Sequence, residues 1–326
     1  MAIDQFGRSL DYLRISLTDR CNLRCVYCMP RDIRFQPKPS LMTDEELFRL
    51  TTLFADLGFR KFRLTGGEPT VRPHVVEIVR HLSHLPGVSE VVMTTNGTRL
   101  AALAQPLADA GLQRVNISLD SLDAQTFQRM TKRGSFDQVW DGVIAAEEAG
   151  LRPIKLNAVI VRGYNDSAVT NLAKLTLDHP WQIRFIELMP LGEMASFSTG
   201  YFFGEGEMRA RIAEEYKPLE PLNSGILDGE ARMYRFPQAV GTVGFISSVS
   251  HPFCAQCNRA RLTADGVLRL CLLRDGEVDL LTPLRAGAED EMLRALIERN
   301  LYRKQWGHQL SDNVVPIGRV MSQIGG

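Results

Sequence analysis

A pattern of alternating hydrophobic and polar positions recurs between residues 13 and 190, in units of about thirty residues, the length of a βα repeat. The candidate strands, which helical patterns separate, span residues 13–19, 61–67, 89–97, 114–120, 153–161 and 182–190. Six units in series predict an α/β fold built on a parallel sheet wound in one direction. Because six units are too few to close an eight-stranded barrel, we expect a partial, open barrel.

The clearest helical pattern lies between the first two predicted strands, in TDEELFRLTTLFADLG at 43–58. Thr43 or Asp44 can cap its start, and acidic residues in the first turn suit the positive end of a helix. Gly58 follows the last apolar position and can end the helix. The sequence therefore predicts a helix over about 44–57.

Several predicted strands carry polar side chains on one face, although a parallel strand covered on both faces is usually apolar throughout. The polar positions are Arg14, Ser16, Thr18, Arg63, Thr65, Asn116, Ser118, Asp120, Lys155 and Asn157. Apolar neighbours such as Ile15, Ile117 and Leu156 point the other way, towards the helices. Each unsatisfied buried polar group costs roughly 1–3 kcal/mol. We therefore expect the inner face to hold a polar ligand; a water-filled structural interior is the alternative.

The regular repeat ends after residue 190, and the rest of the chain follows another pattern. A connection at 191–207 leads to short strand candidates at 232–237, 240–247, 260–266 and 267–273, and to a helical pattern at 289–300. We expect two domains, a partial-barrel core at 1–190 and a smaller, separate α+β module at 191–326.

The chain contains 38 Lys and Arg residues and 38 Asp and Glu residues, so its formal net charge is zero and does not attract a polyanion. We expect no nucleic-acid and no membrane partner, and any polyanionic ligand must meet a local basic pocket. No apolar run approaches a membrane span, and the start lacks the pattern of a signal peptide. A cytoplasmic location is therefore expected.

Six cysteines fall into two sets of three, Cys21, Cys25 and Cys28, then Cys254, Cys257 and Cys271. An odd number in each set, in a reducing compartment, favours metal binding over disulfides. The first set directly follows the first strand, at the edge where parallel α/β folds bind ligands. Three thiolates can hold a four-iron cubane and leave one iron open. A zinc ion completed by a distant His or Asp is the alternative.

Two motifs near the N-terminus resemble those of the radical S-adenosylmethionine (SAM) superfamily. CNLRCVYC at 21–28 is similar to its C-x3-C-x2-C signature, and TGGEP at 65–69 resembles its GGEP motif. The resemblance implies a partial barrel of the radical SAM type with a 4Fe-4S cluster whose open iron binds the amino and carboxylate groups of SAM. It also implies reductive cleavage of SAM to methionine and a 5′-deoxyadenosyl radical.

The second cysteine set, NRARL at 258–262 and the terminal GG resemble the GTP 3′,8-cyclase family of that superfamily, over essentially the whole chain. The resemblance implies an iron-dependent lyase that converts GTP to (8S)-3′,8-cyclo-7,8-dihydroguanosine 5′-triphosphate, the first step of molybdenum cofactor biosynthesis. It implies a second 4Fe-4S cluster as well. Another radical SAM enzyme with an auxiliary cluster and a zinc-stabilised binding protein are the alternatives.

The resemblance also assigns individual residues. The ligands of the first cluster would be Cys21, Cys25 and Cys28, and those of the second Cys254, Cys257 and Cys271. The SAM contacts would be Tyr27, Gly67, Glu68, Ser118 and Met189. The GTP contacts would be Arg14, Arg63, Thr94, Lys155, Arg259, Ala260 and Arg261, with Lys61 and Arg184 as weaker candidates for the triphosphate. Catalysis would involve Arg259, Arg261, Gly325 and Gly326. The implied partners are GTP, SAM, an electron donor, cyclic pyranopterin monophosphate synthase downstream and a second copy in a homodimer.

Three cations on the predicted inner face support a triphosphate site independently of the resemblance. Arg14, Arg63 and Lys155 would share that face, and guanidinium groups bind phosphate oxygens bidentately. The alternative is that each cation pairs with a carboxylate such as Asp120 or Glu187. A terminal Gly-Gly is usually frayed, but it can also thread into a crowded pocket, and we expect the latter.

Overall fold

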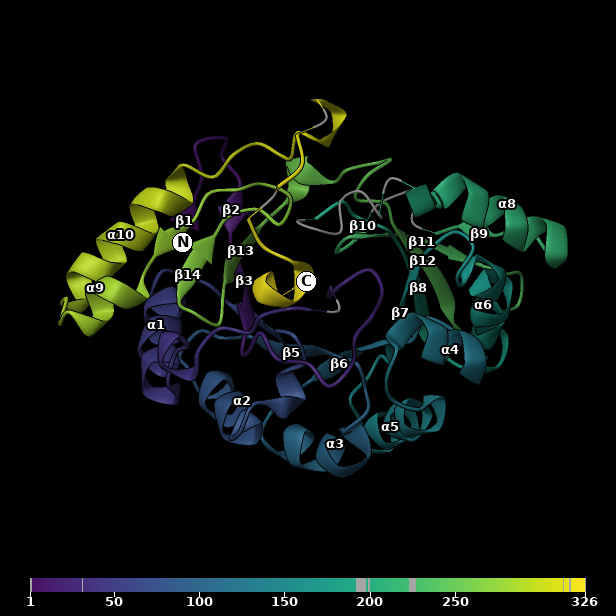
Figure 1. The fold of residues 1–326 in the computed structure, drawn as a ribbon, viewed down its shortest axis with the longest axis horizontal. Coiled ribbons are helices and arrows are strands. Elements are labelled where there is room, and N and C mark those ends of the chain that lie inside the picture. Colours follow the sequence, from purple (N-terminus) through teal and green to yellow (C-terminus); the bar gives the residue numbers. More distant parts are fainter. Residues whose placement is uncertain are drawn as a thin grey trace.

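Most of the strands form one open, strongly curved sheet, with helices along its outer side (Figure 1). The computed structural model describes residues 2–30, 32–191, 198, 200–222, 227–312, 314–316 and 318–325. Gly326, one of the expected catalytic residues, lies outside the described residues.

Six parallel strands make the centre of the sheet, in chain order. They are β3 (Tyr12–Ser16), β4 (Lys61–Thr65), β5 (Glu90–Thr95), β6 (Arg114–Ser118), β7 (Lys155–Ile160) and β8 (Gln182–Glu187). Each pairs in parallel with the next. The sheet does not close on itself, since β10 (Leu227–Asp228) and β15 (Val278–Asp279) end its strand order. The prediction of six βα units in an open parallel barrel is confirmed.

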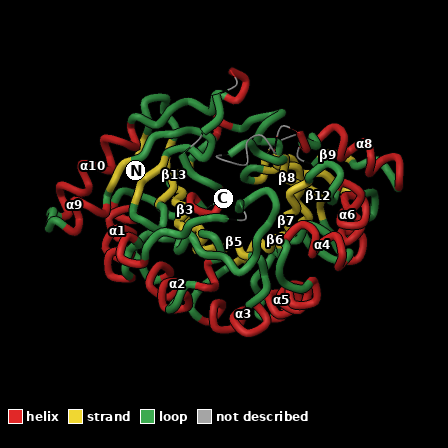
Figure 2. Tube along the Cα trace, in the orientation of Figure 1, coloured by secondary structure: helices red, strands yellow, loops and turns green. Residues whose placement is uncertain are grey.

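Helices cover the outer face of these strands (Figure 2). They are α1 (Asp44–Asp56), α2 (Val75–Ser83), α3 (Leu100–Asp109), α4 (Ala124–Thr131), α5 (Phe136–Glu148) and α6 (Val169–Asp178). Thr43 caps α1: its Oγ1 accepts from the Glu46 amide at 3.2 Å, and the Glu46 carboxylate accepts from the Thr43 amide at 2.8 Å. Gly58 follows with φ +94°, a conformation that favours glycine.

The hydrophobic core lies between this layer and the sheet. Ile15, Ile117 and Leu156 are buried in it, as the alternation predicts, and α1 contributes Leu50 and Phe54 from its inner face. At 25 cal/mol per Å² of buried apolar surface, each such side chain stabilises the fold by roughly 1.5–3 kcal/mol. The opposite faces of the strands are thereby turned towards the inside of the barrel.

The C-terminal third extends both edges of the same sheet. β12 (Thr242–Ile246) pairs in parallel with β8, and β13 (Arg259–Leu262) pairs in parallel with β3. β11 (Ala231–Arg235) and β14 (Val267–Arg269) then add antiparallel strands outside them. The strand and helix candidates in this C-terminal module are found. These strands complete the barrel instead of forming a sheet of their own.

The other elements are short or peripheral. They are β1 (Ala2–Ile3), β2 (Ser9–Leu10), β9 (Glu220–Pro221), α8 (Glu205–Glu215), α9 (Leu281–Arg285), α10 (Asp290–Tyr302), α11 (Met321–Ile324) and the 3-10 helices Lys38–Ser40, Pro69–Val71, Asp166–Ala168, Cys254–Gln256 and Leu310–Asp312. α11 lies within the arc of strands, not on the outer surface (Figure 1). No helix in the described part of the chain has the length and apolar character to cross a membrane.

Candidate functional site

A cavity of about 290 Å³, lined by charged, polar and apolar side chains, occupies the inside of the open barrel. Both cysteine sets line it, together with side chains from the inner faces of β3 to β8 and from β13. The alternation of polar and apolar residues along the strands therefore predicted correctly which face of the sheet lines the cavity. Of the expected polar positions, those that line the cavity are Arg14, Arg63, Thr65, Asn116, Ser118, Asp120 and Asn157.

The first cysteine set lies in the loop after β3. Backbone amides of Arg24 and Val26 donate to carbonyls of Thr131 and Met130, which fixes this loop to the end of α4. Burial raises the pKa of Cys21 to about 11 and that of Cys28 to about 12, with contributions from nearby negative groups. Burial, Asp120 and the other two thiols raise the pKa of Cys25 as well.

These raised pKa values indicate that the first cysteine set needs a nearby positive charge in order to form thiolates. Three partly buried thiols with raised pKa values become thiolates readily beside a strong positive charge, such as iron provides. All six cysteines are free, in agreement with the preference for metal over disulfides. Within the described ranges, no three His, Cys, Asp or Glu side chains are arranged to hold a single metal ion. A cubane, in which each cysteine binds a different iron, needs no such close convergence.

The second cysteine set lies across the cavity in a more cationic setting. Cys254 begins a 3-10 helix and Cys257 directly follows it, while Cys271 comes shortly after β14. Burial alone would raise the pKa of Cys257, but the charges of Lys304 and Arg259 lower it to about 7. The protein itself therefore favours the thiolate form of Cys257, whereas burial raises the pKa of Cys254.

The GGEP segment at the end of β4 packs directly against the start of the cysteine loop. A Cβ on Gly67 would lie 2.3 Å from the Arg20 carbonyl oxygen, and one on Gly66 2.6 Å from that of Thr18. Gly66 also has φ +149°. The two glycines are thus required by a close crossing of two backbone segments, so the motif positions the cysteine loop.

Glu68 is held by the protein instead of being open to a ligand. Its Oε1 accepts from the Thr70 amide at 3.0 Å and from the Thr70 and Thr95 hydroxyls at 2.6 Å, and its Oε2 accepts from the Asn96 amide at 2.7 Å. Burial raises its pKa, and these hydrogen bonds oppose that rise. Glu68 therefore ties the end of β4 to the end of β5, and its expected contact with the SAM ammonium stays a prediction.

The other residues expected to contact SAM also line the cavity. Tyr27, Ser118 and Met189 are partly buried lining residues. The Tyr27 hydroxyl donates to Asp120 Oδ2 at 3.0 Å, and the Val159 amide donates to Oδ1 at 3.0 Å. Burial raises the pKa of Asp120 to about 7, which those hydrogen bonds moderate. Asp120 thus orients Tyr27, and among the residues described no ion pair joins it to Arg63 or Lys155.

Five arginines line the cavity, four from the neighbouring strands β4, β3 and β13 and one from β8. They are Arg14, Arg63, Arg184, Arg259 and Arg261. Arg63 is fixed by Tyr12 and by Thr94, whose hydroxyl accepts from Nη1 at 3.1 Å. Arg184, a weaker sequence candidate, donates to Asn157 Oδ1 at 2.9 Å; burial and then the repulsion of Arg63 and Arg114 lower its pKa to about 10. Several positively charged side chains lie close together here, and this arrangement indicates a binding site for an anion.

Two carboxylates that sequence reasoning missed enter this cation group. Glu230 Oε1 lies 2.6 Å from Arg259 Nη1 and 3.6 Å from Arg14 Nη1, and Asp228 Oδ2 lies 3.3 Å from Lys155 Nζ. Burial favours the neutral form of Glu230, yet Arg259, Arg14 and other arginines lower its pKa far below its usual value. From the sequence, Asp120 and Glu187 were the possible partners of the inner cations. Arg14 and Lys155 do lie beside carboxylates, but these are Glu230 and Asp228.

Three expected GTP contacts lie outside the cavity wall. Lys155 is buried beside Asp228 and does not line the cavity, and Lys61 lies at the start of β4. The side chain of Ala260 is fully buried in the core, because it alternates with Arg259 and Arg261 along β13. A contact from Ala260 would have to come from its backbone.

The end of the chain reaches the cavity. The Gly325 carbonyl accepts from Arg261 Nη1 at 2.7 Å. A Cβ on Gly325 would lie 2.3 Å from Thr65 Oγ1, and its φ of +66° also favours glycine. The Ser322 amide hydrogen-bonds the Cys28 thiol. This C-terminal segment, residues 318–325, which we call the tail, therefore contacts the first cysteine loop, β4 and β13.

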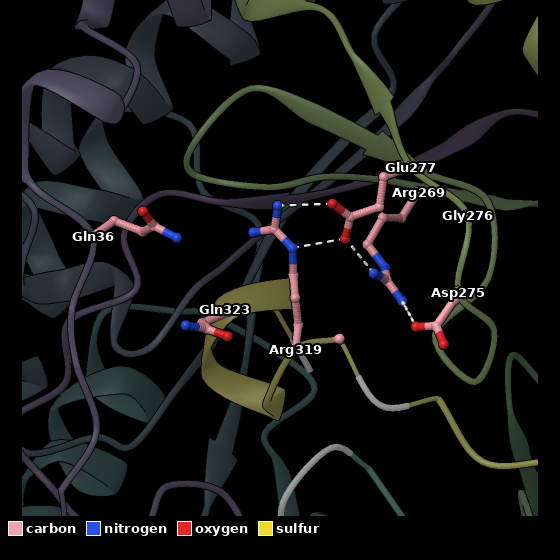
Figure 3. Close-up of a pocket in the computed structure, with 8 residues that line it drawn as sticks. Gln36, Arg269, Asp275, Gly276, Glu277, Arg319 and Gln323 are labelled. Carbon is pink, nitrogen blue, oxygen red and sulfur yellow. Dashed lines mark hydrogen bonds and ion pairs between the residues drawn. The ribbon is translucent and has the colours of Figure 1, made fainter.

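An arginine clamp holds this tail beside a second pocket (Figure 3). Arg319 Nη1 and Nη2 donate to Asp265 at 3.0 and 2.9 Å, and Arg319 Nε and Nη2 donate to Glu277 at 2.7 and 2.9 Å. Arg269 binds the same Glu277 carboxylate from the other side. Two bidentate pairs at one guanidinium fix the point from which α11 enters the barrel.

The chain matches two known families in turn. Residues 15–176 match the Radical SAM superfamily, and residues 181–310 match Molybdenum Cofactor Synthesis C. A protein of Moorella thermoacetica named GTP 3′,8-cyclase is 47% identical over 324 residues, which cover 99% of both chains. A protein of the same name from Pseudomonas putida is 46% identical over 328 residues, covering 99% of this chain and 98% of that one.

Solved structures agree on the fold. SuiB of Streptococcus suis bound to S-adenosylmethionine has a TM-score of 0.62 at 15% identity, covering 94% of this chain and 74% of that one. HydG, a maturase of the FeFe hydrogenase, has a TM-score of 0.50 at 17% identity, covering 63% and 49%. At such identities the likeness shows the shared barrel.

Proposed function

Since this chain belongs to the GTP 3′,8-cyclase family of the radical SAM superfamily, we propose that its cavity holds SAM at the first cysteine set and GTP between the two sets. The chain is an enzyme of molybdenum cofactor biosynthesis that acts on GTP and uses SAM and a 4Fe-4S cluster. The observation that carries the site assignment is the group of five arginines between two sets of three cysteines in one cavity.

Cys21, Cys25 and Cys28 would hold the first cluster, and the fit rests on three free, partly buried thiols in one loop that line the same cavity. When bound, the cluster and SAM supply a 5′-deoxyadenosyl radical that removes a hydrogen atom from the ribose. Tyr27, oriented by Asp120, and Ser118 and Met189 would bound the SAM site, with Gly67 contributing backbone. Glu68 would act indirectly, by holding the segment that carries Gly67.

Cys254, Cys257 and Cys271 would hold a second 4Fe-4S cluster, which we propose anchors the substrate from the opposite side. The cationic setting of Cys257 supports thiolate ligands there. The product joins C3′ of the ribose to C8 of guanine, so the chain has to hold both atoms in near contact. Anchoring GTP at its base and at its phosphates restricts it to that geometry.

The phosphates of GTP would lie among the arginines. Arg14, Arg63 and Arg259 project from three neighbouring strands, and Thr94 keeps Arg63 in place. Guanidinium forks fit phosphate oxygens, and the burial of Arg63 and Arg184 strengthens such contacts. Arg184 belongs to this group, and Lys155 would contribute from the cavity's edge.

Arg261 and the tail would act at the reacting end of the substrate. The Gly325 carbonyl fixes the Arg261 guanidinium by a 2.7 Å hydrogen bond, and this contact supports a catalytic assignment for both. Gly326 would follow directly. A domain boundary near residue 190, a homodimer, an electron donor, cyclic pyranopterin monophosphate synthase as the downstream enzyme and a cytoplasmic location stay predictions.

An anaerobic assay tests the function. Reduced protein is incubated with GTP and SAM, with a control that lacks SAM, and the nucleotides are separated by chromatography. We expect an isomer of GTP in which C3′ is bonded to C8. Cleavage of SAM without that isomer would favour another radical SAM enzyme, and a colourless protein containing zinc alone would favour a binding protein.

A further inference from the structure

A tight hairpin carries carboxylates into the barrel. β10 and β11 pair with Leu227 opposite Arg232 and Asp228 opposite Ala231, which leaves Gly229 and Glu230 as a two-residue turn. Gly229 has φ +66°, as the first position of such turns favours. This turn geometry directs Asp228 and Glu230 towards the cations, and we call residues 228–230 the hairpin tip.

The hairpin tip contacts the cations that we assign to the phosphates of GTP. Glu230 binds Arg259 at 2.6 Å and lies 3.6 Å from Arg14, while Asp228 lies 3.3 Å from Lys155. The Glu230 side chain is 17% exposed and that of Asp228 48%, so Glu230 reaches inward and Asp228 lies at the rim. Each carboxylate thus satisfies a cation in the way that a phosphate oxygen would.

A triphosphate and these carboxylates repel each other strongly at such distances in a buried site. Arg259 and Arg14 cannot keep a close Glu230 carboxylate and receive phosphate oxygens at the same place without that repulsion. The hairpin tip is able to withdraw, because β10 is only two residues long and is the last strand on its edge of the sheet. Its movement leaves the parallel strands paired.

We propose that the hairpin tip is an anionic gate on the nucleotide site, whose carboxylates occupy the phosphate-binding cations in the free enzyme and are displaced by the triphosphate of the substrate. The gate keeps weakly charged anions out of the cation group, and a polyanion opens it. This inference rests on the proposed GTP site and adds a determinant of its anion selectivity.

Equilibrium binding to the cluster-loaded protein tests the gate. GTP and inorganic tripolyphosphate are titrated by calorimetry into the wild type, Glu230→Gln and Asp228→Asn. With the competing charge removed, we expect Glu230→Gln to bind both ligands at least threefold more tightly, and Asp228→Asn to show a smaller gain. Glu220→Gln removes an equal charge from an exposed position on β9 and is expected to leave both affinities unchanged.

Weaker or unchanged binding by Glu230→Gln, with its melting temperature within a few degrees of the wild type, would overturn the gate and make Glu230 a residue that positions Arg259. If the variant unfolds, hydrogen exchange of the wild type decides. GTP should speed exchange of amides in 227–235 and leave 242–246 unchanged, and slower exchange in 227–235 would contradict displacement. Failure of the wild type to bind GTP would instead refute the proposed substrate site.

Discussion

Arg63 illustrates how a single side chain is prepared for an anionic ligand. It extends from β4 into the cavity, where Tyr12 from β3 and Thr94 from β5 hold its guanidinium. Because both partners are neutral, Arg63 keeps a full charge without a carboxylate partner of its own in hydrogen-bond contact among the residues described. An arginine fixed in this way loses little side-chain entropy when a phosphate binds.

Arg63→Ala is therefore expected to weaken GTP binding about 10- to 100-fold, the loss of a charged hydrogen-bonded contact of roughly 1.5–3 kcal/mol. SAM binding should change by less than about threefold, because the first cysteine set lies on another part of the cavity wall. Calorimetric titration of each ligand measures both effects. Arg60→Ala, at an exposed position just before β4, is the matched control. Equal losses for GTP and SAM would argue against a phosphate contact.

At the residue scale, the sequence predicted positions on a regular strand better than positions in turns. Period-two alternation placed Arg14, Arg63 and Asn116 on one inner face, since a strand allows no other arrangement. The same rule turns Ala260 away from the cavity. Glu230 could not be predicted, because its place depends on where a short hairpin folds back. No local periodicity encodes that position.

Elements were predictable where the interactions that form them are local. The capping box at Thr43 and the apolar face of α1 lie within one helix, and both were readable. The pairing of β13 with β3, in which Arg259 lies opposite Tyr12, joins segments about 245 residues apart in the sequence. Such pairing is set by the closing of the whole fold, so the C-terminal strands were found but were assigned to a separate module.

The terminal helix α11 gives a prediction about the tail. Gly325→Ala should lower the rate of GTP cyclisation at least tenfold, because a Cβ at Gly325 meets Thr65 and displaces the carbonyl that holds Arg261. Gly150→Ala imposes a similar positive-φ strain at φ +75° with open space around it, and serves as control. Product formation is measured together with iron content. A Gly325→Ala enzyme with normal turnover would show that the tail only fills space.

The clamp that anchors α11 leads to a second prediction for this element. Arg319→Gln removes the charged hydrogen bonds to Asp265 and Glu277, so the tail should leave the barrel more often. We expect faster hydrogen exchange in 318–325 and a lower cyclisation rate, with both cysteine sets still loaded with iron. Arg49→Gln, which breaks an exposed ion pair with Asp290 on the outer surface, should change neither. Unchanged exchange in 318–325 would contradict the anchoring function.

On the scale of the whole molecule, the open barrel brings distant parts of the sequence to one cavity. Because β13 runs parallel to β3, Cys28 after β3 and Cys254 before β13 lie at opposite ends of these paired strands, and both cysteine sets line the cavity between. The Arg8 guanidinium donates to the Cys254 carbonyl at 2.7 Å and links the N-terminus to the second set. The substrate chamber therefore exists only when both ends of the chain are folded together.

This arrangement predicts that the two cysteine sets separate the two parts of the reaction. Cys25→Ala should abolish cleavage of SAM, because it removes one of the three proposed ligands of the first cluster. Cys254→Ala should still cleave SAM and yet form less than about one hundredth of the cyclised nucleotide, since GTP loses its anchor while the first set stays intact. Both activities are measured on one anaerobic sample, with iron expected to fall from about eight to about four per chain in each variant. Normal cyclisation by Cys254→Ala would refute the second cluster, whereas loss of SAM cleavage in both variants would mean that the two sets depend on each other for folding.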